Sequence, residues 1–142
     1  MKKKYQLSKI IILLLLIFIT TSCETISDCI DRIRPELISK ELRTGVYDVP
    51  YEDNVNFEMI RGNTNDYYIS SISIEGKLPP GFNYSVVNNN TINFKGTPIR
   101  DGTYEFTISI SVSPHTYNED GTGDLCGNTT SKKYTIKIID YR

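Results

Sequence analysis

The chain has 142 residues, of which 16 are basic and 17 are acidic, and its formal net charge is −1 at pH 7. Four of the basic residues lie in the first nine positions, so removal of residues 1–22 would leave 12 basic against 17 acidic residues and a net charge of −5. This balance argues against nucleic acid as a partner, because a nucleic-acid surface needs clustered positive charge. The 120 residues that would remain suffice for one domain with a hydrophobic core.

Residues 1–22 have the order of a secretory signal peptide. Lys2, Lys3, Lys4 and Lys9 precede an unbroken apolar run at residues 10–19, and small polar residues follow it. A helix of ten residues spans only about 15 Å. The hydrocarbon core of a membrane is about 30 Å thick, so we expect a signal rather than a stable transmembrane span.

The sequence Thr20-Thr21-Ser22-Cys23 resembles the lipobox of bacterial lipoproteins, although Thr20 stands where that family more often has Leu. The resemblance implies cleavage before Cys23 and acylation of its thiol, usually with acylation of the new amino terminus. Two or three acyl chains make membrane attachment effectively permanent, since each buried methylene contributes about 0.8 kcal/mol. We therefore expect residues 23–35 to be a lipidated tether on a membrane of the bacterial cell envelope, the outer membrane. The alternatives are an ordinary cleaved signal and an uncleaved helix.

Lipidation of Cys23 would leave two further cysteines, Cys29 and Cys126. Because an exported protein meets an oxidising compartment, two such thiols tend to pair, and we predict a Cys29–Cys126 disulfide. In the loop-entropy model, closing a loop of about 100 residues contributes roughly 4 to 5 kcal/mol. Two cysteines and the single histidine, His115, make a poor set beside the four ligands of structural zinc sites, so we predict no metal and no cofactor.

From residue 55 onward, apolar and polar residues alternate with period two, which indicates strands with one wet face. The residues expected to face inward are Val55, Phe57 and Met59; Tyr68, Ser70, Ile72 and Ile74; Phe82, Tyr84 and Val86; Ile92 and Phe94; Tyr104, Phe106, Ile108, Ile110 and Val112; and Tyr134, Ile136 and Ile138. Turn signals separate these runs at residues 61–66, 76–81, 88–90 and 96–102. This spacing of short strands predicts an all-β sandwich.

Four short motifs follow one another in the second half of the chain: Leu78-Pro79-Pro80-Gly81-Phe82, Thr91-Ile92, Gly96-Thr97-Pro98 and Gly102-Thr103-Tyr104-Glu105-Phe106. In this order they resemble the cadherin-like Ig repeats of bacterial surface proteins, over about residues 45–140. The chain departs from that pattern by inserting Asn93-Phe94-Lys95 and by carrying one copy where the family is often tandem. The resemblance implies a single Ig-like antiparallel β-sandwich of about seven strands, which we place at residues 36–142.

Tyr104 stands just after Asp101-Gly102. Ig folds place a tyrosine corner at this position, a buried ring whose hydroxyl bonds to backbone a few residues upstream. We prefer this structural role for Tyr104 to a role in ligand binding.

Groups suited to catalysis are sparse. His115 is the single histidine and follows Pro114 in a predicted loop, whereas a catalytic triad usually needs a histidine as general base. The carboxylate pairs Glu52–Asp53 and Glu119–Asp120 would serve glycoside hydrolysis only if both groups faced one sugar bond across a cleft. We therefore predict no catalytic residues and a protein that is not an enzyme.

The connection at residues 114–131 has 18 residues, whereas a hairpin needs about 2 to 5. Asn118, Asp120 and Asp124 place oxygen-bearing side chains among glycines there, as calcium loops do, although the final glutamate of the EF-hand is absent. They are the candidate calcium ligands. The alternative is a polar loop held at one end by Cys126.

Two classes of function remain. The first is a binding, adhesion or scaffolding module that meets an envelope protein or a glycan. Tyr67 and Tyr68 are neighbours in a predicted strand and must face opposite sides, so one of them is a candidate exposed ring for sugar stacking. The second class is an accessory subunit or small enzyme for glycan processing at the cell surface.

The anchor and the predicted disulfide also predict an orientation. Because Cys29 lies six residues after Cys23, even an extended tether holds Cys126 within about 20 Å of the anchor. The connections expected together at this membrane-proximal end of an Ig sandwich are residues 61–66, 88–90 and 114–131. The opposite end, with residues 78–82 and 98–102, is expected to face a large partner.

Overall fold

The computed structural model describes residues 32–116 and 125–141. The signal peptide, Cys23, Cys29 and the candidate calcium ligands Asn118, Asp120 and Asp124 all lie outside these ranges. Within them, no helix is long and apolar enough to cross a membrane.

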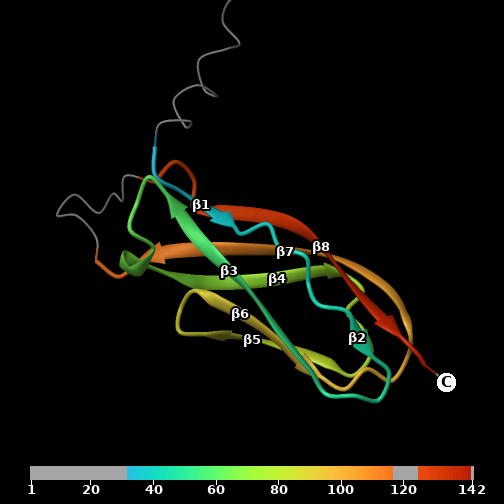
Figure 1. Cartoon of the computed structure of the whole chain (residues 1–142). Coiled ribbons are helices and arrows are strands. Elements are labelled where there is room, and N and C mark those ends of the chain that lie inside the picture. The colour runs from blue at the N-terminus through green and yellow to red at the C-terminus, as the bar shows by residue number, and fades with distance from the viewer. Residues whose placement is uncertain (1–31, 117–124, 142) are drawn as a thin grey trace, which may run out of the picture. The chain divides into compact units, whose positions relative to one another are not determined.

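Within residues 32–116 and 125–141, eight strands form two four-stranded sheets (Figure 1). The first sheet has the order β1 (Arg34–Leu37), β3 (Tyr51–Ile60), β6 (Thr91–Gly96), β5 (Phe82–Val87). The second has the order β2 (Gly45–Val46), β8 (Thr129–Ile139), β7 (Gly102–Pro114), β4 (Tyr67–Gly76). Immunoglobulin sandwiches place strands A, B, E and D in one sheet and C, F and G in the other, which is the same order. The prediction of an all-β, Ig-like sandwich is confirmed.

The first strand of the sandwich is divided between the two sheets, which accounts for eight strands where about seven are expected. β1 pairs antiparallel with β3, and β2 pairs parallel with β8. The intervening residues 38–44 therefore pass from one sheet to the other. Gly45 permits the second pairing, because a Cβ atom there would lie 2.6 Å from Cδ1 of Ile138. β1 begins at Arg34, so it crosses the expected boundary between tether and domain.

Apolar side chains of both sheets fill the space between them. The buried apolar residues are Leu37, Leu42, Tyr51, Val55, Phe57, Met59, Ile69, Phe82, Ile92, Phe94, Phe106, Ile108, Ile110, Val112, Tyr134, Ile136 and Ile138. The inward-facing residues predicted for β3, β6 and β8 are thus all confirmed, as are those of β7 from Phe106 onward.

β4 departs from the predicted alternation at its beginning. Ile69 is buried, whereas Ser70 is exposed and Tyr68 only half-buried, so the inward assignment of these last two residues is wrong. The pairing of β4 with β7 shifts register between Ile69 and Ser71, which marks a β-bulge. The extra residue of a bulge changes which face the following side chains occupy. Ile72 and Ile74 accordingly pack against the core as predicted, half-buried.

β5 departs from the prediction because it is an edge strand. Tyr84 and Val86 lie opposite the buried residues Phe94 and Ile92 of β6, which puts them on the inner face of the sheet. They are nevertheless 41% and 39% exposed, and Phe82 is the one buried residue of this strand. The expectation that Tyr84 and Val86 belong to the core is therefore wrong.

The connections predicted to share one end of the sandwich do so. The carbonyl of Asn89 accepts a hydrogen bond from the Ile69 amide at 2.8 Å, and the carbonyl of Asp66 accepts one from the His115 amide at 2.8 Å. The first bond joins the β5–β6 turn to the beginning of β4, and the second joins the β3–β4 connection to the beginning of the β7–β8 connection. Which end of the sandwich meets a membrane stays a prediction.

The opposite end contains the predicted tyrosine corner. The Tyr104 hydroxyl lies 3.3 Å from the carbonyl of Arg100 and 3.2 Å from that of Asp101, and it donates to this pair of acceptors. The ring is partly buried against the core. Nearby, the Ile99 amide donates to the Pro80 carbonyl at 3.1 Å, so the two proline-containing turns are joined.

Candidate functional site

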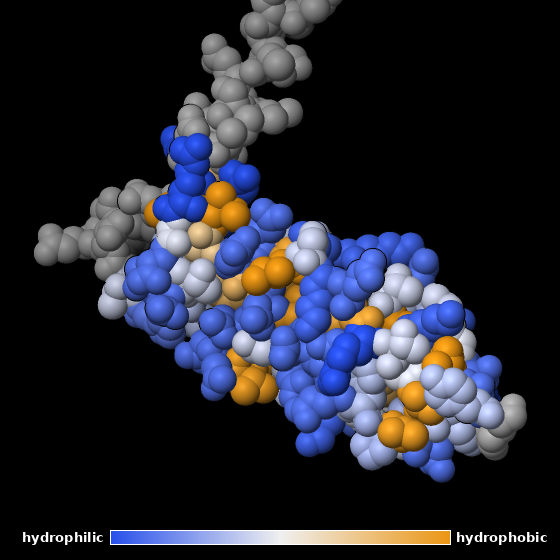
Figure 2. Space-filling view, in the orientation of Figure 1, coloured by the Kyte–Doolittle hydropathy of each residue, from blue (hydrophilic) through white to orange (hydrophobic). Residues whose placement is uncertain are grey.

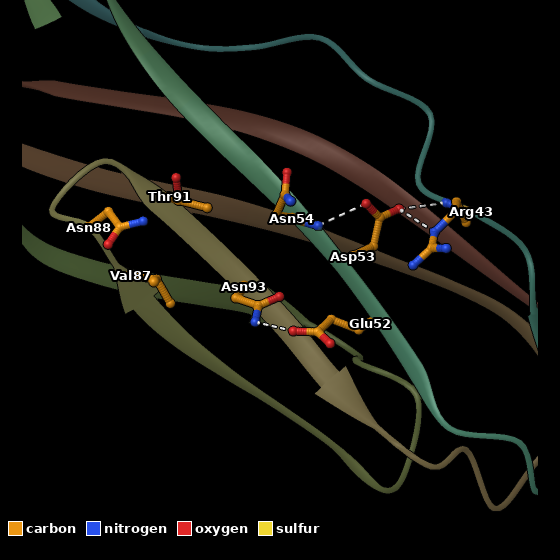
Figure 3. A pocket seen from close by; sticks show the side chains of 8 residues that line it. All are labelled: Arg43, Glu52, Asp53, Asn54, Val87, Asn88, Thr91 and Asn93. Carbon is orange, nitrogen blue, oxygen red and sulfur yellow. Dashed lines mark hydrogen bonds and ion pairs between the residues drawn. The ribbon is translucent and has the colours of Figure 1, made fainter.

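An open groove of about 510 Å³ lies against the first sheet (Figure 3). Its lining residues are Arg43, Glu52, Asp53, Asn54, Val87, Asn88, Thr91 and Asn93. Most of them come from β3, from β6 and from the turn between β5 and β6. All but Val87 carry a polar side chain, so the groove suits a ligand that is rich in hydrogen-bonding groups.

The alternation of β3 produces the polar floor of this groove. Every second residue of the strand is buried, so Glu52 and Asn54 point away from the core. Asn54 is paired with Asn93 of β6, and the Asn93 side-chain amide donates to Oε1 of Glu52 at 2.9 Å. Asparagine is depleted in strands. The pairing of Asn54 with Asn93 on adjacent strands is therefore not explained by the stability of the strands alone.

Two side chains in the floor of the groove have polar atoms without a hydrogen-bond partner among the described residues. Within the described part of the chain, Oε2 of Glu52 and the side-chain amide of Asn54 make no hydrogen bond to protein. A carboxylate accepts through both oxygens, and an amide both donates and accepts. The groove thus presents one carboxylate held by Asn93, and one amide unpaired within the described chain, to a hydroxylated ligand.

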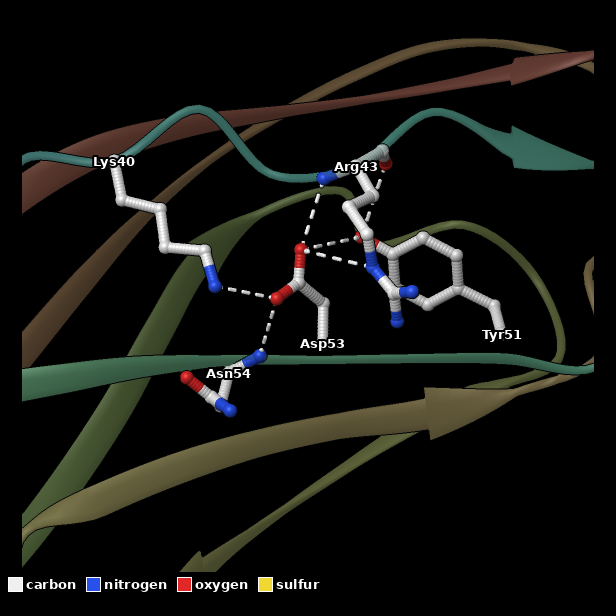
Figure 4. Close-up of polar contacts among 5 residues, drawn as sticks. All are labelled: Lys40, Arg43, Tyr51, Asp53 and Asn54. Carbon is white, nitrogen blue, oxygen red and sulfur yellow. Dashed lines mark hydrogen bonds and ion pairs between the residues drawn. The ribbon is translucent and has the colours of Figure 1, made fainter.

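Asp53 closes one side of the groove and is the one buried charged residue of the described chain, 6% exposed. Its Oδ1 accepts from Nζ of Lys40 at 2.5 Å and from the Asn54 amide at 2.8 Å, while Oδ2 accepts from the Arg43 amide at 2.9 Å (Figure 4). Burial alone would raise the pKa of this carboxyl, but the Arg43 amide, the Lys40 ammonium and the Asn54 amide outweigh it and hold the pKa below its usual range.

The Asp53 carboxylate fastens residues 38–44 to β3. The Tyr51 hydroxyl adds a hydrogen bond to the Arg43 carbonyl at 3.0 Å, and burial followed by the nearby Asp53 charge raises the pKa of Tyr51. The Arg43 guanidinium lies 5.9 Å from the centre of the Tyr51 ring. The wall of the groove is therefore held in place before any ligand arrives.

The same segment is fastened to the second sheet by β8. Nζ of Lys132 donates to the Leu37 carbonyl at 2.6 Å and to Oγ of Ser39 at 2.8 Å. The Tyr134 hydroxyl donates to the Ile38 carbonyl at 2.9 Å, and burial raises the pKa of Tyr134 to about 12. Both sheets thus contribute side chains that hold residues 38–44, the crossing between β1 and β2, in place.

The sequence-predicted carboxylate pair Glu52–Asp53 lines the groove, but its two members have different surroundings. They are neighbours on a strand, so Glu52 faces outward while Asp53 is turned toward residues 38–44. The oxygens of Asp53 are already occupied by Lys40 and by backbone amides. Glu52 is the carboxylate that remains available to a ligand.

The other sequence-predicted residues lie away from the groove. Cys126 is placed beside β1: its amide donates to the Ile33 carbonyl at 2.8 Å, and Leu125 forms a parallel bridge with Ile33. Cys29 is outside the described ranges, so the disulfide stays a prediction. The described residues contain no group of three or more metal-ligating side chains.

Of the two adjacent tyrosines, Tyr67 packs against the core. The centre of the Tyr68 ring lies 5.1 Å from the centre of the His115 ring, and Tyr68 is half-buried. Sequence reasoning did not find Asn54, Asn93 or Arg43 as parts of a site. The one signal available for the first two was an asparagine in the middle of a strand.

No family model and no curated protein sequence matches the chain. Solved structures match it at low sequence identity. An endo-fucoidan hydrolase of glycoside hydrolase family 107 is 19% identical, with a TM-score of 0.50, over 77% of this chain and 14% of that one. The sialic acid binding region of a Streptococcus sanguinis adhesin is 15% identical, with a TM-score of 0.50, over 78% of this chain and 31% of that one.

The titin Ig tandem domains are 10% identical, with a TM-score of 0.43, over 75% of this chain and 49% of that one. This chain therefore spans less than a third of the length of the hydrolase and of the adhesin region. The strand order of the two sheets defines an Ig-like domain.

Proposed function

We propose that this protein is an Ig-like binding module of the bacterial cell envelope, anchored through a lipidated Cys23, and that it binds a hydroxyl-rich ligand such as a glycan. The ligand lies in the groove over β3 and β6, in contact with Glu52, Asn54 and Asn93. The signal and lipobox-like sequence support the location. The resemblance to cadherin-like Ig repeats supports a role in surface binding.

The observation that carries the proposal is the Glu52–Asn93 hydrogen bond of 2.9 Å. It fixes a carboxylate on a rigid sheet with one oxygen still available, next to the open amide of Asn54. Hydrogen bonds to charged groups contribute about 1.5 to 3 kcal/mol each. A sugar hydroxyl both donates and accepts, so this pair of groups matches its needs.

The similar structures indicate which ligands to test first. One is named as a sialic acid binding region and another as an endo-fucoidan hydrolase. Sialylated and fucose-containing glycans are therefore the first members of a panel that also includes neutral polysaccharides.

The test is a glycan panel probed with the full chain in membrane vesicles. Glu52→Gln and Asn93→Ala are expected to weaken binding of the selected glycan at least about tenfold, which is about 1.4 kcal/mol. Glu58→Gln is the matched control, because Glu58 is exposed on the same strand but outside the groove. Equal binding by Glu52→Gln and Glu58→Gln would show that the groove is not the binding site.

We also propose that the module binds its glycan without cleaving it. A glycosidase needs a carboxylic acid that holds a proton near neutral pH. Asp53, the carboxyl next to Glu52, has a lowered pKa and is already hydrogen-bonded. Release of reducing sugar from the bound glycan, lost on Glu52→Gln substitution, would favour the alternative of a small glycan-processing enzyme.

A further inference from the structure

Each sheet has β4 or β5 as one of its two edge strands, and both of these strands carry partly uncovered apolar side chains. Ile72 and Ile74 of β4 are half-buried, and Tyr84 and Val86 of β5 are exposed. All four belong to the inner faces of their sheets. Figure 2 shows a largely hydrophilic surface in the same orientation as Figure 1, with hydrophobic residues in separate patches. Three of the seven exposed large hydrophobic residues of the described chain lie on β5, namely Tyr84, Val86 and Val87.

β5 has none of the features that protect an edge strand. Natural edges are blocked by charged side chains, proline or bulges, because unpaired backbone groups otherwise accept another strand. The strand reads Phe-Asn-Tyr-Ser-Val-Val, with no charge and no proline, and it pairs with β6 in an unbroken register. β4, by contrast, contains the bulge between Ile69 and Ser71.

We propose that β5 pairs antiparallel with β5 of a second copy across a two-fold axis, so that the two first sheets become one continuous sheet. The absence of charge on β5 permits a second copy of the same strand as the occupant. Like charges directly opposite one another destabilise a sheet, and a symmetric pair opposes each strand to itself. An uncharged strand is compatible with that arrangement. The same axis brings the exposed Tyr84 and Val86 of both copies together, so each copy supplies the apolar cover that the other lacks.

The register of the pair follows from the alternation of the strand. Directly opposed residues of antiparallel strands lie on the same face, so an inner-face residue must oppose another inner-face residue. With Ser85 on the axis, Tyr84 opposes Val86 of the second copy, an aromatic and β-branched pair of the favourable kind. With Tyr84 on the axis, Val86 would instead oppose Phe82, which is already buried within its own copy.

Cysteine cross-linking tests this register in the full chain. Ser85→Cys is expected to form a disulfide-linked dimer on mild oxidation, because two copies of residue 85 face each other on the axis. Asn83→Cys is the matched control: Asn83 opposes Val87, so its two copies are separated by about four residues, or about 13 Å along the strand. A disulfide needs Cα atoms within about 7 Å. The unsubstituted chain gives the background from its native cysteines.

A Ser85→Cys variant that cross-links no more than the unsubstituted chain, or no more than Asn83→Cys, would overturn the proposal. Sedimentation gives a second readout without new thiols. Val86→Lys is expected to abolish the dimer by placing like charges near the axis. Ile38→Lys, at a residue 37% exposed that follows β1 at the opposite edge of the same sheet, is expected to leave the dimer intact. A chain that stays monomeric at every concentration would refute self-pairing. Glu52→Gln should not alter dimerisation, so this test is independent of the glycan proposal.

Discussion

Lys40 and Asp53 form an ion pair, with 2.5 Å between Nζ and Oδ1, that joins the crossing between β1 and β2 to the middle of the first sheet. The Asp53 side chain is 5% exposed and that of Lys40 is 33% exposed. The pair therefore lies at the boundary of the core, where a carboxylate without partners would be costly. It explains how a chain with little regular structure at residues 38–44 keeps a defined path.

Replacement of Asp53 by Ala is expected to lower the free energy of unfolding by about 2 to 4 kcal/mol, because the Lys40 ammonium and two backbone amides lose their acceptor. Chemical denaturation monitored by circular dichroism measures this. Glu58→Gln, an exposed carboxylate on the same strand, is expected to change stability by less than about 0.5 kcal/mol. Equal effects of the two substitutions would show that the ion pair contributes nothing specific.

Stability is also expected to depend on pH through Asp53. Its pKa is lower in the folded protein than the value of about 3.9 in an unfolded chain. The stabilisation is therefore fully present above that unfolded value and is lost as the pH falls through the folded pKa. Denaturation midpoints measured from neutral pH to below pH 4 should decline less steeply for Asp53→Asn than for the unsubstituted chain. Parallel declines would argue against this carboxyl as the source.

The tyrosine corner gives a smaller expected effect. Tyr104→Phe removes the hydroxyl that donates to the Arg100 and Asp101 carbonyls, so we expect a loss of about 0.5 to 1.5 kcal/mol in thermal or chemical unfolding. Tyr84→Phe is the control, because the Tyr84 hydroxyl has no protein partner among the described residues. If both variants unfold alike, the hydrogen bonds of Tyr104 contribute no stability.

The Cys29–Cys126 disulfide is expected in protein taken from its native compartment. The hydrogen bond between the Cys126 amide and the Ile33 carbonyl places Cys126 beside a residue only four positions after Cys29. Non-reducing peptide mapping should recover the cross-link, and reduction should lower the melting temperature. Alkylation of both thiols without prior reduction would contradict the prediction.

Processing is expected to leave a mature chain that begins at Cys23, carries acyl groups and partitions with membranes. Intact mass spectrometry of the native protein measures this directly. Cys23→Ser should be released in soluble form or keep its signal. An amino terminus elsewhere, without acyl mass, would exclude the lipoprotein assignment.

The sequence correctly predicts the strands in which one face is entirely apolar and the other entirely polar. Phe106, Ile108 and Ile110 alternate with hydroxylated residues along β7, so burial of one face follows directly from the pattern. Tyr84 and Val86 show the same alternation, yet they are exposed, because alternation does not reveal which strand ends a sheet. The bulge before Ser71 could not be predicted, because the alternation of apolar and polar residues does not show where a strand takes up an extra residue.

The groove could not be predicted from the sequence because its floor depends on pairing between distant residues. Asn54 and Asn93 become neighbours only through the register of β3 against β6. Arg43 reaches the same groove from the crossing between the sheets, whose path depends on the Asp53 contacts. An asparagine within a strand was a usable signal, but it did not indicate the partner.

The division of the first strand between two sheets determines how the domain responds to a pulling force. A pull on the chain before residue 33 first loads the contacts of Ile33 with Leu125 and Cys126. If Cys29 and Cys126 are reduced, the load then reaches the four-residue pairing of β1 with β3. Once β1 has separated from β3, the load passes to residues 38–44. Their hydrogen bonds to Lys132, Tyr134 and Asp53 then have to break one after another. Reduced protein would therefore extend by a few residues under load while β3 and β6 keep the groove intact, whereas the predicted Cys29–Cys126 disulfide would transmit the load past β1 and prevent this extension.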